Sequence, residues 1–268
     1  MITKLYTLTL LSLISVLLKS GTSWCYFGMF THTNDVLEAS YSPDGSKIVV
    51  ASNDNNHYIY NALSFLVEYP LTATTRANTA KYSRDGLYIA IGLQNNSVLI
   101  YSSSYTFVAA IPTAFGVVNE LHFNKQSTLM LVCGGGGSNG YEIFNVPTWT
   151  IAHSDYTYGD SGLSCRFADD SGRYAVGTKD GYIRYYFPSN ILILQNQMNS
   201  NADVEGLDFS PNGSYLLVAW SGAGRKVGIF DLTSVSPEFN LSGSSSNTFY
   251  CTDWSEDGTL FSYAGNSN

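Results

Sequence analysis

Short apolar runs recur along the chain, and turn residues bound each of them. The runs are too short for helices, so they predict strands buried on both faces. The buried runs are residues 47–51, 88–92, 129–133, 174–177, 215–219 and 260–264. Alternating strands follow the first five, at residues 57–60, 97–101, 141–144, 182–185 and 226–230. A fourth strand is expected at residues 65–69, 107–111, 149–152 and 191–194.

An aromatic residue followed by a turn precedes each buried run, as in Tyr41-Ser-Pro-Asp-Gly45 and Phe209-Ser-Pro-Asn-Gly213. The Pro, Asp, Asn and Gly residues supply the backbone angles that a tight reversal needs. Successive aromatic positions are 41 to 45 residues apart, which is the period of a propeller blade. These positions are Tyr41, Tyr82, Phe123, Phe167, Phe209 and Trp254. The pattern predicts an all-β fold, a β-propeller of about six four-stranded blades.

The segment Gly177-Thr-Lys-Asp-Gly-Tyr-Ile-Arg-Tyr-Tyr186 resembles the second and third strands of the WD-repeat family. The resemblance covers residues 36–268 and implies a degenerate member of that β-propeller family. The Trp-Asp pair that names the family is reduced to Phe230-Asp231 in one repeat, and the Gly-His pair is missing. The family's buried His/Asp network therefore cannot be assigned to residues of this chain.

The N-terminus has the layout of a secretory signal peptide. Lys4 precedes an uncharged stretch over residues 5–18, and the small residues Gly21 and Ser23 follow. We therefore expect residues 1–23 to be a signal peptide, residues 24–268 to be one propeller domain, and the protein to be secreted. The uncharged stretch is too short to span a bilayer. The alternative is that residues 5–18 form a strand of the fold.

Closure of the propeller is expected to use the N-terminal strand. Residues 24–31 precede Tyr41 by the usual lead of a fourth strand, while the last repeat supplies two strands. The third strand of that blade then has three alternative explanations. The blade has three strands or the sequence is incomplete, residues 5–18 are retained as the strand, or a neighbouring molecule donates one by β-augmentation.

Charge excludes one class of partner. Only 13% of residues are charged, the net charge is -8, and the 13 Lys and Arg residues are scattered. Phosphate backbones require clustered cations, so a nucleic-acid partner is excluded.

Few residues form a pattern that carries chemistry. Four cysteines allow two disulfides, but the expected register separates Cys133 from Cys165 by about 10 Å, which favours free thiols. The histidines lack metal-ligand spacing. The glycine-rich run 134–140 and the amide cluster 53–56 are interpreted as turns rather than phosphate or calcium sites. No catalytic residue, metal or cofactor is predicted. The cysteines are Cys25, Cys133, Cys165 and Cys251, and the histidines are His32, His57, His122 and His153.

Two further sets of residues are candidates for the surface. N-glycosylation sequons begin at Asn95, Asn212 and Asn240. Tyr156, Tyr158 and Trp220 are predicted to form an aromatic contact surface on one face.

The leading hypothesis is a secreted, non-enzymatic scaffold that binds a protein partner or copies of itself. One alternative is an extracellular hydrolase or lyase with a central-channel site. Its nearest candidates are Glu38, Glu120, His122, Glu205 and Asp208. Another alternative is an intracellular WD-type adaptor.

Overall fold

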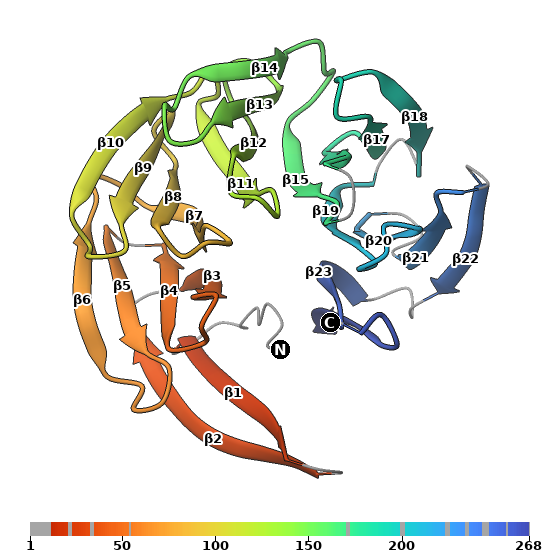
Figure 1. The fold of residues 1–268 in the computed structure, drawn as a ribbon. Coiled ribbons are helices and arrows are strands. Elements are labelled where there is room, and N and C mark those ends of the chain that lie inside the picture. The colour runs from red at the N-terminus through yellow and green to blue at the C-terminus, as the bar shows by residue number, and fades with distance from the viewer. Residues whose placement is uncertain are drawn as a thin grey trace.

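A computed structural model gives the fold, and it describes residues 12–20, 23–32, 35–53, 55–169, 172–198, 202–222, 226–233, 236–242, 247–255 and 257–267. Within these ranges the regular elements are strands, and there is no helix. Figure 1 shows the sheets arranged around a central axis. The all-β prediction is therefore confirmed for the described part of the chain.

Five antiparallel sheets have four strands each, and each is traced in chain order from its innermost strand outward. The first is β3 (Val36–Tyr41), β4 (Lys47–Ser52), β5 (Asn56–Asn61) and β6 (Val67–Thr72). The second is β7 (Ala77–Tyr82), β8 (Tyr88–Leu93), β9 (Ser97–Ser102) and β10 (Phe107–Pro112). The third is β11 (Val117–Phe123), β12 (Leu129–Gly135), β13 (Gly140–Asn145) and β14 (Ile151–Asp155). The fourth is β15 (Gly162–Phe167), β16 (Tyr174–Thr178), β17 (Tyr182–Tyr186) and β18 (Leu192–Gln197). The fifth is β19 (Val204–Phe209), β20 (Tyr215–Trp220), β21 (Lys226–Asp231) and β22 (Ser236–Ser242).

Two further sheets have two strands each among the described residues. The pair β23 (Asn247–Trp254) and β24 (Phe261–Ser267) continues the series of inner strands. The pair β1 (Ser12–Ser20) and β2 (Ser23–His32) precedes the first four-stranded sheet. Part of the predicted signal peptide thus forms a strand that pairs with β2.

Two of the expected fourth strands begin later than predicted. β6 starts at Val67 rather than at residue 65, and β14 starts at Ile151 rather than at residue 149. The reason is local, because Phe65 and Trp149 have φ angles of 57° and 56° and form the turn itself. A positive φ does not fit a strand.

Every inner strand contains a β-bulge at the same place. The pairing register shifts after the first one to three residues of β3, β7, β11, β15, β19 and β23. A bulge leaves backbone groups without a partner in the ladder. Side chains of the preceding sheet bind some of these groups, since Asn78 Nδ2 donates to the Val118 carbonyl at 2.9 Å and Asn119 Nδ2 to the Gly162 carbonyl at 2.7 Å. The bulges therefore connect neighbouring sheets.

A small residue recurs where the second strand of one sheet packs against the inner strand of the next. A Cβ added at Gly92 would lie 2.5 Å from Val118 Cγ1, and one at Gly177 would lie 2.4 Å from Val204 Cγ1. Each glycine is the last residue of the apolar run of its repeat. Close packing between sheets explains why this position stays small.

Cys133 occupies the same repeat position, and this corrects the predicted separation of two cysteines. Cys133 and Cys165 are both fully buried in one apolar cluster, and the Cys165 thiol donates to the Glu120 carbonyl at 3.6 Å. The separation of about 10 Å assumed a four-residue turn after each repeated aromatic. Phe123 instead pairs with Met130, which sets Cys133 opposite Glu120 and places it in the same apolar cluster as Cys165. Burial raises the pKa of the Cys165 thiol. Cys133, Cys165 and Cys251 are free thiols, and the side chain of Cys25 lies outside the described part.

Candidate functional site

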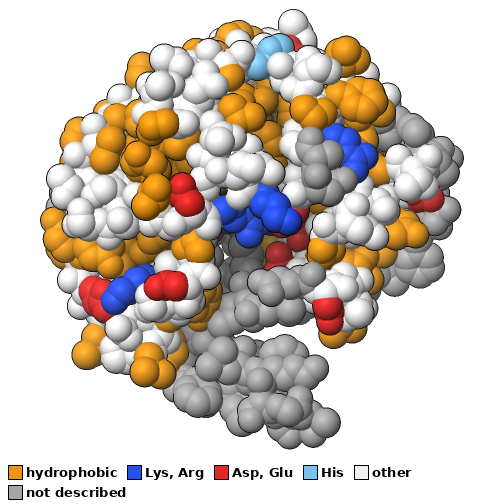
Figure 2. All heavy atoms as spheres, viewed as in Figure 1, with side chains coloured by type: hydrophobic (Ala, Val, Ile, Leu, Met, Phe, Trp, Pro, Cys, Tyr) orange, Lys and Arg blue, Asp and Glu red, His pale blue; other side chains and the backbone are white. Residues whose placement is uncertain are grey.

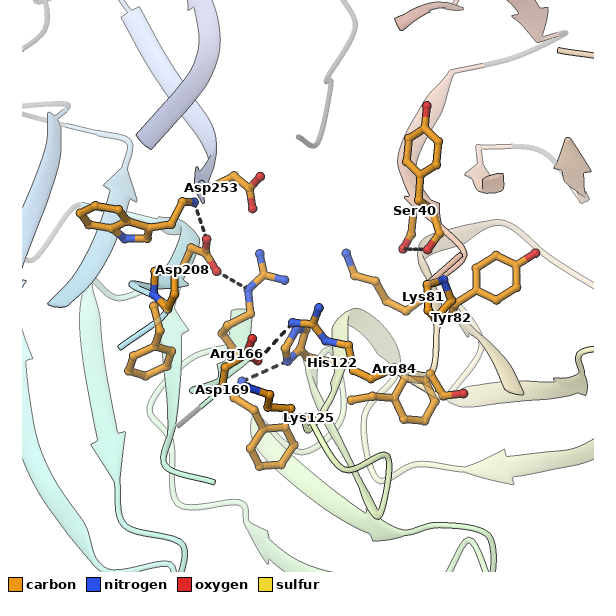
Figure 3. A pocket seen from close by; sticks show the side chains of 18 of the residues that line it. Ser40, Lys81, Tyr82, Arg84, His122, Lys125, Arg166, Asp169, Asp208 and Asp253 are labelled. Carbon is orange, nitrogen blue, oxygen red and sulfur yellow. Dashed lines mark hydrogen bonds and ion pairs between the residues drawn. The ribbon is translucent and has the colours of Figure 1, made fainter. Parts of the chain in front are cut away.

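A cavity of about 730 Å³ lies on the central axis at one end of the sheets. Its walls are the last residues of the six inner strands and the turns that follow them (Figure 3). In an antiparallel meander, the turns after the first and third strands lie at the same end of the sheet. We call this end the cavity end.

One position of the repeat faces the axis in all six inner strands. It is the residue immediately before the repeated aromatic, and side chains alternate between faces along a strand. Both residues contribute to the cavity lining, but four of the aromatic rings also pack in the apolar clusters between sheets, namely those of Tyr82, Phe123, Phe167 and Phe209. The six residues at this position are Ser40, Lys81, His122, Arg166, Asp208 and Asp253.

Charges of both signs meet in the cavity. Lys81 and Arg166 come from the second and fourth sheets, while Asp208 and Asp253 come from β19 and β23. Three charged residues of the turns complete the lining: Arg84, Lys125 and Asp169. Arg84 Nη2 lies 3.2 Å from Asp169 Oδ1. Figure 2 shows Lys and Arg side chains gathered beside the axis, with Asp and Glu side chains next to them.

Asp208 joins three successive inner strands. Its Oδ2 accepts a hydrogen bond from the Trp254 backbone N–H at 2.6 Å, and its Oδ1 lies 3.2 Å from Arg166 Nε. Burial raises the pKa of Asp208 to about 7; Arg166 opposes this shift, and the neighbouring Asp253 carboxyl adds to it. Both Asp208 oxygens are therefore engaged in holding adjacent sheets.

The other channel candidates of the hydrolase hypothesis also bind the next sheet. Glu38 accepts hydrogen bonds from Thr79 Oγ1 at 2.6 Å, from the Ala80 backbone N–H at 3.1 Å and from Lys81 Nζ at 2.6 Å. Glu120 Oε2 accepts the Cys165 backbone N–H at 3.0 Å, and His122 Nδ1 accepts the Phe167 backbone N–H at 3.1 Å. These contacts assign the three side chains a structural role between sheets. In each case the donor lies on the inner strand of the next sheet, β7 for Glu38 and β15 for Glu120 and His122.

Glu205 is not part of this cavity. It lies near the opposite end of β19, where Ser221 Oγ donates to its Oε1 at 3.4 Å. The five candidates are thus not brought together as one catalytic set. Among the described residues, no group of three or more His, Cys, Asp and Glu side chains is arranged to hold a metal ion.

Burial of Glu205, with the nearby Asp203 charge, raises its pKa from 4.5 to about 7. The folded protein then binds this proton more tightly than the unfolded chain, so the stabilisation is complete below pH 4.5 and is lost as the pH rises to about 7. We expect Glu205→Gln to flatten the decline of unfolding free energy between these pH values, by about 3 kcal/mol at most. Urea unfolding at several pH values measures this. Glu68→Gln, whose carboxylate is exposed to solvent, should leave the decline unchanged, and an equal effect of both substitutions would contradict the assignment.

The predicted aromatic contact surface is mostly buried. Tyr156 is 39% exposed, but Tyr158 is 6% and Trp220 is 5% exposed, so these two do not form a contact surface. Tyr158 turns inward because its hydroxyl pairs with the Tyr186 hydroxyl at 2.7 Å. Tyr141 and Tyr174 form a second such pair at 2.7 Å within the same apolar cluster. The tyrosines therefore stabilise the packing of the third sheet against the fourth.

The sequons and turn clusters fall at several places. Asn95 and Asn212 lie in exposed turns, whereas the Asn240 side chain lies outside the described residues. The glycine-rich run ends β12 and turns into β13, as predicted. In the amide cluster 53–56, Asp54 lies outside the described part.

Sequence reasoning missed Lys81, Arg166 and Asp253 as lining residues. A signal for them exists in the repeat itself. Reading the residue before each repeated aromatic across all six repeats would have listed the residues that surround the axis. No single repeat shows this, because the charges become neighbours only around the axis.

Residues 24–61 match the family model described as WD domain, G-beta repeat. A search of curated proteins finds no match. Among the described residues, no helix is long and apolar enough to cross a membrane. The matched segment runs from β2 through β5 and so includes three strands of the first four-stranded sheet. The match and the recurring four-stranded sheet together support a WD-repeat family for this chain.

Proposed function

We propose that the protein is a non-enzymatic scaffold that binds a protein partner at the cavity end. WD repeats indicate a protein-interaction scaffold. A fold by itself does not specify a function, so the choice of surface must come from the residues. The channel carboxylates support a non-enzymatic role, because Glu38, Glu120 and Asp208 are engaged with the backbone of neighbouring sheets.

The observation that carries the proposal is an uneven distribution of exposed apolar residues. Turns at the cavity end carry large apolar side chains that are each at least 47% exposed. In the described connections at the opposite end, the exposed large apolar residue is Tyr156, and it is less exposed, at 39%. Exposed apolar residues gathered on one face are typical of protein-binding surfaces. Those at the cavity end are Leu63, Leu66, Leu87, Phe187, Ile191 and Leu260.

Cross-linking of the native protein before purification tests this surface. We expect cross-linked peptides of a partner to map to the turns at the cavity end. The variant Leu66→Ser with Ile191→Ser should lose the cross-linked partner, and Tyr156→Ser at the opposite end should keep it. A native protein that stays monomeric, or cross-links confined to the opposite end, would contradict the proposal.

We also propose that β2 is the outer strand of a sixth blade whose inner strands are β23 and β24. β2 stands before β3 in the chain as β6 stands before β7. The register of β2 against β1 skips one residue, Phe27, just as the register of β6 against β5 skips Glu68. The WD-repeat match begins at Trp24, at the start of β2. Protection of β2 amides from hydrogen exchange together with those of β24 would support this closure, and rapid exchange of β2 alone would contradict it.

Secretion remains a proposal from the N-terminal sequence and the sequons. Intact-mass measurement of the native protein tests it. We expect a mature chain that begins near Trp24 and a mass that decreases on enzymatic removal of N-glycans from Asn95 or Asn212. An unglycosylated chain that retains residues 1–23 would contradict secretion. It would support the alternative in which β1 supplies the third strand of the closing blade.

A further inference from the structure

The cavity offers hydrogen-bond donors that no described residue uses. Arg166 binds Asp208 and the Leu207 carbonyl through its Nε atom, at 3.2 Å in both cases. Its two terminal nitrogens have no hydrogen-bond partner among the described residues, and the guanidinium points into the cavity (Figure 3). Lys125, on the turn after β11, is exposed and likewise has no partner within the described ranges. Two cations from adjacent sheets thus face the same space.

The acceptors of the same cavity are already engaged. Asp208 uses both oxygens, on Trp254 and Arg166, and Asp169 accepts from Arg84. The Asp208 carboxyl is also hydrogen-bonded with Asp253, and its pKa of about 7 lowers the negative charge of this wall at neutral pH. A ligand group that complements the cavity must therefore bring acceptors and negative charge.

Charge distribution over the whole chain supports the same conclusion. The chain has 21 Asp and Glu residues against 13 Lys and Arg residues, yet four cations and three Asp residues line this cavity. Behind this lining, Glu38 binds Lys81 and Glu120 acts on Arg166, so Lys125 and the terminal nitrogens of Arg166 are the cationic groups that face the cavity without a described partner. A cationic guanidinium binds carboxylate and phosphate oxygens in a forked geometry that neutral groups do not match. The volume of about 730 Å³ is that of a ligand site rather than of a single ion.

We propose that the cavity binds a carboxylate or phosphate group between Arg166 and Lys125, and that an acidic segment of the protein partner carries it. The identity of the carrier rests on the function proposed above, whereas the oxyanion site rests on the cavity alone. Arg166 supplies the directional contact from its two terminal nitrogens. Lys125 supplies charge at the mouth, and the apolar turns around the cavity contact the rest of the segment.

Fluorescence anisotropy of the full chain with a labelled peptide tests the site. The probe is Gly-Glu-Gly-Glu-Gly, and its control is the same peptide with Gln in place of Glu. We expect the Glu peptide to bind at least about tenfold more tightly, as expected for one charge-assisted hydrogen bond. Citrate and inorganic phosphate, added in separate titrations, should displace it. Equal binding of the two peptides would overturn the acidic carrier.

Two substitutions locate the site, and a third is their control. Lys125→Gln should weaken binding of the Glu peptide about tenfold without altering the unfolding midpoint, since Lys125 is exposed. Arg166→Gln should abolish it, with folding verified by circular dichroism. Arg76→Gln removes the same charge from the connection between β6 and β7, at the opposite end, and should bind as the parent does. If Lys125→Gln and Arg76→Gln bind the Glu peptide with the same affinity, the assignment of the oxyanion site to Arg166 and Lys125 is wrong.

The outcomes separate the two proposals. If citrate or phosphate binds and the Glu peptide does not, the oxyanion site stands and its peptide carrier is overturned. If the Glu peptide binds in an Arg166-dependent manner while native cross-links map to the opposite end, the oxyanion site stands and the proposed docking surface is wrong. If no anion binds and native cross-links map to the cavity end, the proposed docking surface stands and the oxyanion site is overturned.

Discussion

Replacing Asp208 with Ala is expected to lower the free energy of unfolding by about 3 to 5 kcal/mol, the usual cost of removing one partner of a buried ion pair. The substitution leaves the Arg166 guanidinium, whose side chain is 11% exposed, without its carboxylate. It also leaves the Trp254 backbone N–H without its acceptor. Because these groups belong to β15, β19 and β23, the loss should loosen three successive inner strands together.

Urea unfolding at pH 8, where Asp208 is ionised, measures this loss. The matched control is Asp169→Ala, which removes a carboxylate from the Arg84–Asp169 pair at the exposed rim of the same cavity. Exposed pairs contribute at most about 1 kcal/mol, so the control should unfold close to the parent. Similar losses for the two variants would show that Asp208 does not hold the sheets together.

Replacing Gly92 with Ala is expected to lower the unfolding free energy by about 3 kcal/mol, near the upper range for overpacking a filled core. The added Cβ would meet Thr79 Cγ2 and Val118 Cγ1, both at 2.5 Å. Thr79 belongs to the same sheet and Val118 to the next one, so neither can retreat without moving an inner strand. The interface between the second and third sheets should therefore open first.

A double-mutant cycle with Val118→Ala distinguishes this clash from an intrinsic preference for glycine. Val118→Ala alone removes buried methyl groups and should cost about 2 kcal/mol. In the double variant the clash with Cγ1 is gone, so the combined loss should be smaller than the sum of the single losses. Additive losses, measured by urea unfolding, would show that the spacing between these sheets does not depend on Gly92.

The same close packing explains why small residues recur at the position of Gly92 in the second strand of other sheets. Gly92 and Gly177 pack against Val118 and Val204 at the bulges of the next sheets. Cys133 fills the same place in the third sheet, where the facing residue of the next sheet is Gly162, and a Cβ added at Gly162 would lie 3.0 Å from Cys133 Cβ. The two free thiols of Cys133 and Cys165 therefore share one apolar cluster between the third and fourth sheets.

The repeat of an aromatic residue, a turn and a buried run was sufficient, by itself, to predict the strands, their order and a WD-like propeller architecture. These features depend on backbone preferences and on periodicity within about 40 residues, which the sequence displays directly. The predicted start of β6 was wrong because Phe65 takes a positive φ, and no neighbouring residue in the sequence indicates this. Only the tertiary structure decided that Asp208 would bind Trp254 and Arg166, and that Tyr158 and Trp220 would be buried. Those outcomes depend on how one sheet is staggered against the next, which is set by bulges, small residues and side-chain volume across the interface rather than by any single repeat.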